Sequence, residues 1–301
     1  MRYAFILMLA FLAAPYSAMA VQVFACEPEW AALAKEIGGD KVEVFAATHA
    51  KQDPHHIRAK PSLIAAMRKA ELVVCSGASL EAGWLPVLLQ KAGNANAQPG
   101  TPGYLLAAEV VPVLEKPERL DRADGDIHPE GNPHVHLNPG NIALVAKELL
   151  QRLKTIDAAN ADAYQAGYDA FSDKWHQATE RWQYSAAALK GMPVVVHHRS
   201  FTYLLAWLGM REAGSLELKP GIPPSATHLE SLLQRFKERP VRVILRTPYE
   251  PEDASQWLAE KTGTPALVLP YTIGGDDQSV DLFALFDRTL ALLEEARRDQ
   301  R

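Results

Sequence analysis

The sequence predicts an α/β protein with two parallel-sheet lobes that are joined by one long rigid α-helix. Three observations support this fold class. Short apolar runs alternate with helix-like segments from residue 21 onward, a long amphipathic stretch interrupts the alternation, and a second α/β series follows it. We therefore expect an N-terminal lobe over 21–157, a connecting helix over 158–189 and a C-terminal lobe over 190–301, with a ligand site in the cleft between the lobes.

The first twenty residues have the pattern of a secretory signal peptide. They read MRYAFILMLAFLAAPYSAMA, with a basic residue at Arg2, a short apolar run and an A-x-A ending before Val21. The apolar run is too short for a spanning helix, and an uncleaved anchor is the alternative. Because no cysteine follows the cleavage site, we expect an exported, periplasmic protein without a lipid anchor.

The composition limits the class of partner. The formal net charge is −5, and the chain has no run of Lys and Arg, which argues against nucleic acid as a partner. No stretch after residue 20 approaches the roughly 20 apolar residues that a membrane span needs. We expect a soluble monomer.

Strand-like runs begin the N-terminal lobe. VQVFAC (21–26), KVEVFAA (41–47) and AELVVC (70–75) alternate with helix-like segments over 28–40, 60–70 and 79–93, and a further strand is expected in 103–114. In a sheet of order 2-1-3 the first and third strands are neighbours. Cys26 and Cys75 would then lie at the same sheet edge, and export favours a disulfide between them; two buried free thiols are the alternative.

The rest of the chain continues this pattern. A helix is expected over 138–153, and apolar or aromatic residues in steps of three and four over 158–189 predict the long connecting helix. Beyond it, strands are expected at 192–198, 241–247 and 264–271. Helices are expected at 201–209, 227–240, 252–263 and 281–299.

Three histidine clusters stand beside strand ends or helix starts. They are QDPHHIRAKPS (52–62), GNPHVHLNP (131–139) and VVVHHRSFTY (194–203). Ligand sites in open α/β sheets form beyond the carboxyl ends of the strands, and imidazole is a preferred ligand of zinc. Successive side chains in an extended segment point to opposite faces, so one histidine of each pair can enter a shared site. The spacing alone leaves structural histidines as an equal alternative.

The motifs resemble those of the cluster A-I solute-binding proteins, the zinc- and manganese-binding receptors of bacterial ABC transporters. The family has DPH with Pro-Ser six residues later, DPHvWlDP, and H-x-x-F-x-Y, and this chain matches the three motifs in that order at His55, His134 and His198. The resemblance covers nearly the whole mature chain. It implies that these three histidines bind the metal and that the long helix is the family's connecting helix.

The fourth ligand departs from the family pattern. Thr247 and Pro270 stand where many members have acids. The variant resembles the AztC-type zinc-binding proteins, whose site has three His and one Asp, and this resemblance favours Asp276. A solvated acid, with water as the fourth donor, is the alternative. Four further residues are candidates for auxiliary metal donors: Asp277, Glu250, His136 and His128.

The segment 117–133 corresponds to a His- and Asp-rich loop of the family that gathers or transfers metal. Here it carries Asp121, Asp124, Asp126 and His128, and a plain solvated loop is an equal interpretation. If it acts on the metal, it affects capture or transfer from a periplasmic zinc metallochaperone.

These inferences predict a zinc receptor that delivers its ion to the membrane permease of an ABC importer, and no enzymatic activity. Nitrogen-rich sites suit zinc better than manganese, which prefers more oxygen ligands; a manganese or other transition-metal receptor is the alternative. An exported zinc hydrolase is a further alternative, although the chain has no H-E-x-x-H motif. An adhesin or a receptor for an organic ligand fits the three histidines less well.

Overall fold

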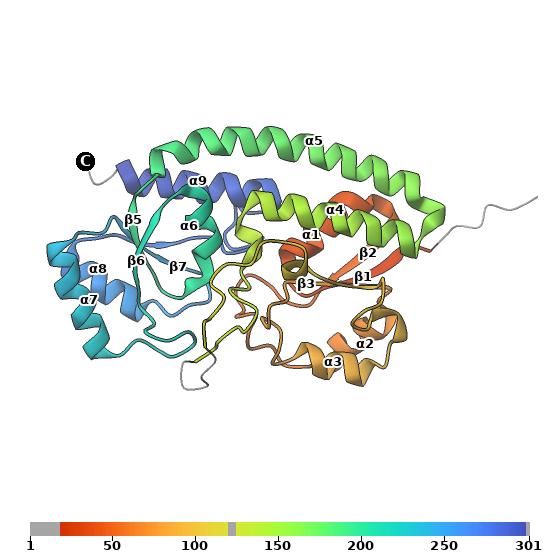
Figure 1. The fold of residues 1–301 in the computed structure, drawn as a ribbon, viewed down its shortest axis with the longest axis horizontal. Helices are drawn as coiled ribbons and strands as arrows, with labels where there is room; N and C mark the ends of the chain where they lie inside the picture. Colours follow the sequence, from red (N-terminus) through yellow and green to blue (C-terminus); the bar gives the residue numbers. More distant parts are fainter. Residues whose placement is uncertain (1–18, 120–124, 299–301) are drawn as a thin grey trace, which may run out of the picture.

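The computed structural model describes residues 19–119 and 125–298. Most of the expected signal peptide, residues 1–18, lies outside the described residues. Two lobes lie side by side, and one long helix runs across both of them (Figure 1). Within the described residues, no helix combines the length and the apolar character that crossing a membrane requires.

The N-terminal lobe contains a parallel sheet of four described strands. They are β1 (Val21–Ala25), β2 (Val42–Ala46), β3 (Leu72–Cys75) and β4 (Tyr104–Leu106), in the order β2-β1-β3-β4. Alternate side chains of β1 pack on opposite faces. Val23 packs in the core cluster that includes α1 (Pro28–Gly38), and Phe24 packs in the cluster that includes α2 (Pro61–Lys69) and α3 (Leu85–Ala92).

The C-terminal lobe has the same strand order. Its described strands are β5 (Pro193–Val196), β6 (Arg211–Ser215), β7 (Val243–Arg246) and β8 (Ala266–Val268), all parallel, in the order β6-β5-β7-β8. Buried residues of α6 (Thr202–Leu208) share a core cluster with Val194, whereas α7 (Ala226–Glu238) and α8 (Asp253–Thr262) pack with Val195. Strand β6 was not expected, because its sequence REAGS contains no β-branched or aromatic residue.

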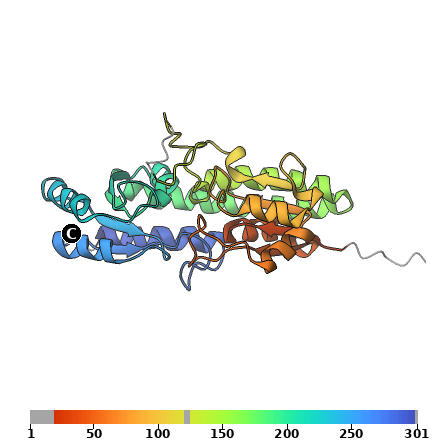
Figure 2. The same ribbon diagram turned by 90° about the horizontal axis from the view of Figure 1, so that it is seen from below.

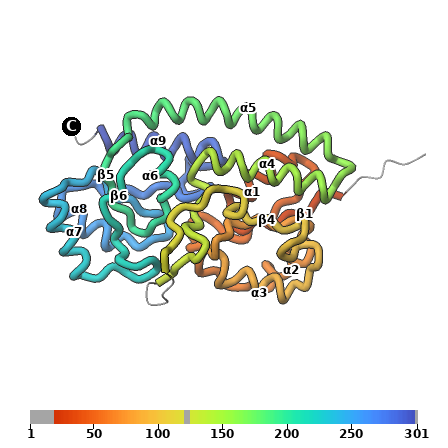
Figure 3. The backbone as a smooth tube through the Cα atoms, in the orientation of Figure 1, coloured from red at the N-terminus to blue at the C-terminus, as the bar shows by residue number. Residues whose placement is uncertain are grey.

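Helix α5 (Ala161–Ala186) joins the lobes, as the amphipathic pattern predicts. It follows α4 (Pro139–Ile156), and short 3-10 turns at Ala158–Asn160 and Ala187–Leu189 extend it at both ends. The backbone trace in Figure 3 shows α5 passing above both lobes, with the final helix α9 (Leu282–Arg298) beneath it. The rings of Trp182 and Phe286 stack with their centroids 4.9 Å apart. The connection between the lobes is therefore reinforced by a second helix.

Two N-terminal elements are shorter than the sequence predicts. The helix expected over 79–93 begins at Leu85, and residues 79–84 form turns in which Ser79 has a φ of 64°. The strand expected within 103–114 is limited to Tyr104–Leu106 and is followed by a 3-10 turn. Because both elements are shorter, the loops near the carboxyl edge of the sheet are longer than expected, and binding residues are commonly found at this edge.

The predicted disulfide joins Cys26 and Cys75, whose Cα atoms lie 4.8 Å apart. Strands β1 and β3 pair directly in the sheet, so the residues at their carboxyl ends come together. Both cysteines are fully buried. The covalent link fixes the strand ends at the edge of the N-terminal sheet from which the histidine-bearing segments leave.

Candidate metal centre

His55, His134 and His198 converge between the lobes, although nearly 150 residues of chain separate the first from the last. One ligand atom of each lies within 4.8 Å of those of the other two. The ring centroids are 5.4 Å apart for His55 and His134, 5.5 Å for His55 and His198, and 5.4 Å for His134 and His198. The segments that follow β2, β4 and β5 thus bring three imidazoles around one point.

Each of the three imidazoles is held through its Nδ1 atom. His55 Nδ1 lies 2.7 Å from Asp53 Oδ1, and His198 Nδ1 lies 2.8 Å from Glu217 Oε2. An ionised carboxylate can only accept a hydrogen bond, so these contacts place the proton on Nδ1 and leave the Nε2 lone pair for a metal.

His134 differs in its partner, because its Nδ1 atom lies 2.7 Å from the hydroxyl group of Tyr271. A hydroxyl group can donate or accept, so this contact alone does not fix the proton. The opposite atom, His134 Nε2, is buried and has no hydrogen-bond partner among the described residues. A buried imidazole nitrogen without a partner is costly unless something binds to it.

The electrostatic environment differs among the three histidines. Burial and the neighbouring histidines hold the pKa of His134 well below its usual value. Burial also disfavours the charged form of His198, but the hydrogen bond and the charge of Glu217 outweigh it and raise the pKa of His198. The pKa of Asp53 is lowered despite its burial, because the carboxylate accepts hydrogen bonds from His55. The acidic partners Asp53 and Glu217 thus place negative charge beside two of the three imidazoles, which favours a cation at this site.

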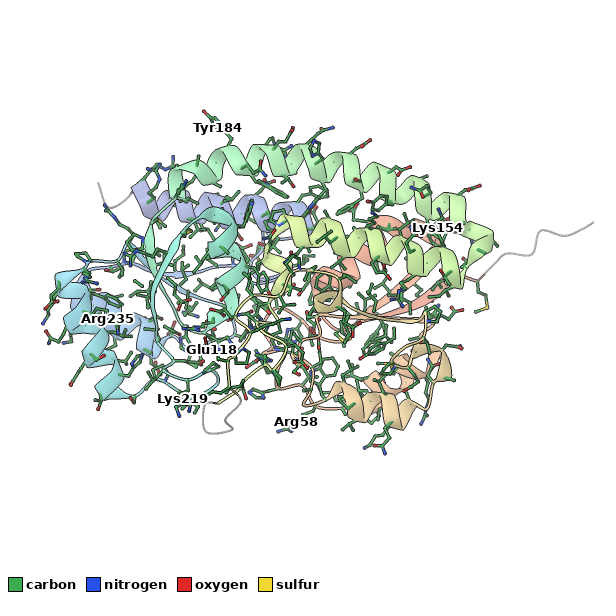
Figure 4. The ribbon with its side chains drawn as sticks, in the orientation of Figure 1. Arg58, Glu118, Lys154, Tyr184, Lys219 and Arg235 are labelled. Carbon is green, nitrogen blue, oxygen red and sulfur yellow. A yellow bond between two sulfur atoms is a disulfide. The ribbon has the colours of Figure 1, made fainter. Side chains whose placement is uncertain are left out.

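A cavity of about 980 Å³ opens beside His134 and His198. Glu118 and Lys219 line it, and both lie in the region between the lobes in Figure 4. Because Glu118 precedes α4 and Lys219 follows β6, the cavity has walls from both halves of the chain. It gives the histidines a route to solvent.

A family model matches most of the chain. The model described as ZnuA, zinc-uptake complex component A, periplasmic, matches residues 23–296. The chain belongs to this ZnuA family. ZnuA-family proteins and their relatives are extracytoplasmic, metal-binding substrate-binding proteins of ABC transporters, and they are not enzymes.

Individual relatives of this ZnuA-family chain are distant. The metal ABC transporter substrate-binding lipoprotein FimA of Streptococcus parasanguinis is 23% identical over 250 residues, which cover 80% of this chain and 76% of FimA. The manganese ABC transporter substrate-binding lipoprotein PsaA of Streptococcus pneumoniae is 24% identical over 219 residues, covering 69% and 66% of the two chains. A crystal structure of ZnuA has a TM-score of 0.75 and 23% identity, and the match covers 91% of this chain and 99% of that one.

His128, one of the auxiliary candidates, lies beside His55. Its Nε2 atom is 3.3 Å from Nε2 of His55. Burial, followed by the charges of His55 and His198, lowers the pKa of His128 to about 3. The backbone nearby is anchored to the other lobe, because Asp126 N donates to the carbonyl oxygen of Pro220 at 2.8 Å. Asp121 and Asp124 of the same loop lie outside the described residues.

Asp276 is not brought into the histidine group in the part of the chain that the structure describes. Its Oδ1 atom accepts hydrogen bonds from the backbone and hydroxyl groups of Ser279, and Oδ2 accepts from Arg288 Nε at 2.7 Å. Partial desolvation opposes ionisation, but these hydrogen bonds lower the pKa of Asp276. The carboxylate thus closes the turn that follows Gly274 and Gly275 in this ZnuA-family member, a role that the sequence analysis did not anticipate.

The remaining auxiliary candidates occupy different environments. Asp277 is exposed on the same turn as Asp276. Glu250 is buried, accepts a hydrogen bond from Thr247 N at 2.7 Å, and lines a cavity of about 90 Å³ together with His55 and His198; burial raises its pKa to about 7. Both ring nitrogens of His136 face protein atoms, because Nε2 lies 2.8 Å from the carbonyl oxygen of Tyr271 and Nδ1 lies 3.3 Å from Glu29 Oε1. His136 is therefore occupied in the protein core.

The sequence analysis missed the partners of the histidines. Glu217 follows the unexpected strand β6, and Asp53 stands two residues before His55 in the quoted motif. An acid close to a histidine or just after a strand would have been the available signal for both. Tyr271 offered no such signal, because its role depends on a contact with a residue 137 positions away.

Proposed function

We propose that this ZnuA-family protein captures zinc as its cargo and delivers it to the membrane permease of an ABC importer. His55, His134 and His198 act as ligands through their Nε2 atoms. The observation that carries this proposal is the convergence of three imidazoles whose Nδ1 atoms are held by Asp53, Tyr271 and Glu217. Partners of this kind orient the ring and increase the basicity of the coordinating nitrogen.

The donor set favours zinc over manganese. PsaA is named for manganese, whereas the family model is named for zinc uptake, so the family includes relatives of both kinds. Manganese prefers oxygen ligands and higher coordination numbers, while zinc accepts a tetrahedral site of nitrogen ligands. In this chain the nearby carboxylates of Asp53 and Glu217 already contact Nδ1 atoms, so the atoms that face the centre are nitrogens.

We further propose that His128 supplies the fourth donor in place of Asp276. Two neutral imidazole nitrogens that face each other at 3.3 Å need either a proton or a cation between them. A bound zinc ion would let His55 and His128 both offer a lone pair. The hydrogen bond from Asp126 to Pro220 supports this role, because it holds the segment before His128 against the C-terminal lobe.

The wider setting of this function is also proposed. The protein acts as a monomer in the periplasm, released by its signal peptide and free of a lipid anchor. The large cavity beside His134 and His198 gives a periplasmic metallochaperone or free zinc access to the ligands. Glu118 and His128 contribute to this access, since both line the cavity.

Metal content and calorimetry on the mature protein test this proposal. We expect one zinc per wild-type chain. The variants His55→Ala, His134→Ala and His198→Ala should each lose at least tenfold in zinc affinity, while His176→Ala, an exposed histidine on α5, serves as the control and should bind as the wild type does. Tighter binding of manganese than of zinc by the wild type would overturn the choice of metal. Full zinc affinity in the three ligand variants would overturn the site.

A further inference from the structure

A buried chain of polar contacts runs away from His134, on the side opposite its free Nε2 atom. The Tyr271 hydroxyl contacts His134 Nδ1, and the Tyr271 carbonyl oxygen accepts a hydrogen bond from His136 Nε2 at 2.8 Å. His136 Nδ1 then lies 3.3 Å from Oε1 of Glu29, and the other oxygen of Glu29 accepts a hydrogen bond from the Thr272 hydroxyl group. All five residues are at most 3% exposed.

The chain of contacts joins the two lobes. Glu29 belongs to α1, and His134 and His136 belong to the segment that leads into α4. Tyr271 and Thr272 follow β8 of the C-terminal lobe. The direct contact from Glu29 to Thr272 spans 243 positions. Tyr271, the partner of His134, thus belongs to the C-terminal lobe and is held by contacts with residues of the N-terminal lobe.

The contacts restrain both ends of Tyr271. Its backbone is fixed by the hydrogen bond from His136, and its ring meets the His136 ring edge-on with the centroids 4.7 Å apart. The Tyr249 ring also meets the Tyr271 ring edge-on, with the centroids 5.6 Å apart. A hydroxyl group that must stay 2.7 Å from an imidazole nitrogen depends on such packing, because a small rotation of the ring would break the hydrogen bond.

Glu29 and His136 face each other with buried polar atoms that have few other partners. Glu29 Oε1 and His136 Nδ1 are both buried, and within residues 19–119 and 125–298 neither has a hydrogen-bond partner other than their mutual contact. A buried carboxylate and a buried imidazole are expensive to desolvate, and an apolar pair of the same size would stabilise the fold at lower cost. Their presence therefore calls for a role beyond packing.

We propose that Glu29 and His136 are positioning residues for metal capture. They hold Tyr271 so that its hydroxyl group fixes the orientation of the His134 ring, and they make this arrangement depend on correct docking of the two lobes. The inference rests on the proposed function, since it concerns how His134 is presented to the metal. Neither residue contacts the ion.

The test compares zinc affinity, measured by competition with a chelator, in variants of the full mature chain. Glu29→Met and His136→Phe remove the polar contacts and should weaken zinc binding by about 10- to 100-fold. Glu29→Gln and His136→Gln keep an acceptor or a donor and should restore part of that loss. Tyr164→Phe is the matched control, because it removes the hydroxyl hydrogen bond to Asp157 Oδ2 at 2.8 Å from a buried side chain of α5 and leaves all the contacts described above in place. The control should bind zinc as tightly as the wild type.

A double-mutant cycle separates positioning from a general loss of stability. Tyr271→Phe removes the hydroxyl group through which Glu29 and His136 are proposed to act. In that background Glu29→Met should cause less than a threefold further loss of zinc affinity, because the contacts no longer lead to His134. Independent, multiplying losses would overturn the inference, as would wild-type affinity in both Glu29→Met and His136→Phe. A wild-type protein that does not bind zinc would instead remove the proposed function itself.

Discussion

Glu217 holds His198 by accepting a hydrogen bond from its Nδ1 atom at 2.8 Å, and the same oxygen accepts from the backbone of Gly221 at 2.8 Å. The acid thus connects a candidate ligand to the loop after β6. Burial disfavours the charged imidazole, but the hydrogen bond and the charge of Glu217 outweigh it and raise the pKa of His198, so this imidazole keeps its proton to a higher pH than an isolated histidine.

Zinc binding should therefore weaken as the pH falls through the raised pKa of His198, because a proton then competes for Nε2. The stability of the metal-free protein depends on pH in the opposite direction. The proton on His198 contributes to its free energy of unfolding below the pKa of the unfolded chain, and this contribution is lost as the pH rises through the raised pKa. Glu217→Gln should move the decline of zinc affinity to lower pH and weaken binding by about tenfold at pH 8. Calorimetry between pH 5 and 8 measures the zinc affinity and its pH dependence. The same pH dependence in Glu217→Gln as in the wild type would contradict the role of Glu217.

The fourth donor can be identified by comparing two variants. His128→Ala should lower zinc affinity by at least tenfold, because it removes the nitrogen that lies 3.3 Å from His55 Nε2. Asp276→Ala should leave zinc affinity unchanged and cost about 1 kcal/mol of stability, since its partly exposed carboxylate bonds Ser279 and Arg288. Chelator competition and urea unfolding give the two quantities. The reverse pattern would restore Asp276 as the ligand.

The disulfide should support stability more than metal binding. Cys26 and Cys75 close a loop across 49 positions, and the double variant Cys26→Ser/Cys75→Ser should lower the free energy of unfolding by about 2–5 kcal/mol. Urea unfolding of the wild type and of the double variant measures the difference. We expect zinc affinity within threefold of wild type, because both sulfur atoms are buried away from the three imidazoles. Loss of zinc binding under conditions where the variant is folded would show that the strand ends position the ligands.

The lobes should move little when zinc binds. Two long helices, α5 and α9, pack against each other, and Trp182 donates a hydrogen bond to Asp287 at 2.6 Å in addition to its contact with Phe286. Bending this pair would break buried aromatic contacts, so large hinge closure is disfavoured. Small-angle scattering of the metal-free and zinc-loaded protein should give nearly equal radii of gyration. A clear compaction on zinc addition would contradict this expectation.

Much of the fold could be predicted from the sequence because it depends on local periodicity. The strands that lead to Cys26 and Cys75 and the long helix follow from apolar patterns that a short window contains. The adjacency of the two strands follows from the 2-1-3 order of doubly wound sheets. Strand β6 could not be predicted, because REAGS owes its extended form to pairing with β5 rather than to its own propensity. The start of α3 at Leu85 likewise depends on turns that the sequence did not reveal.

The candidate site also has a part that the sequence predicts and a part that depends on contacts between distant residues. The three histidines stand in recognisable motifs at strand ends, and the structure brings them together. The choice of Asp276 came from the resemblance to the AztC-type site, and a resemblance of motifs does not reveal that Arg288, twelve residues later, pairs with this acid. His136 is equally hidden, since its contacts with Glu29 and Tyr271 join segments over 100 residues apart.

The contact between Glu29 and Thr272 also bears on when the centre can first form. A partly synthesised or partly folded chain that ends before Tyr271 would contain His55, His134 and His198 without the hydroxyl group that holds the second of them, and without α9 beneath α5. Contacts between such distant positions form late in folding, because closing so large a loop costs entropy before any contact repays it. An immature chain would therefore hold metal loosely, and firm retention would begin when the last helix docks.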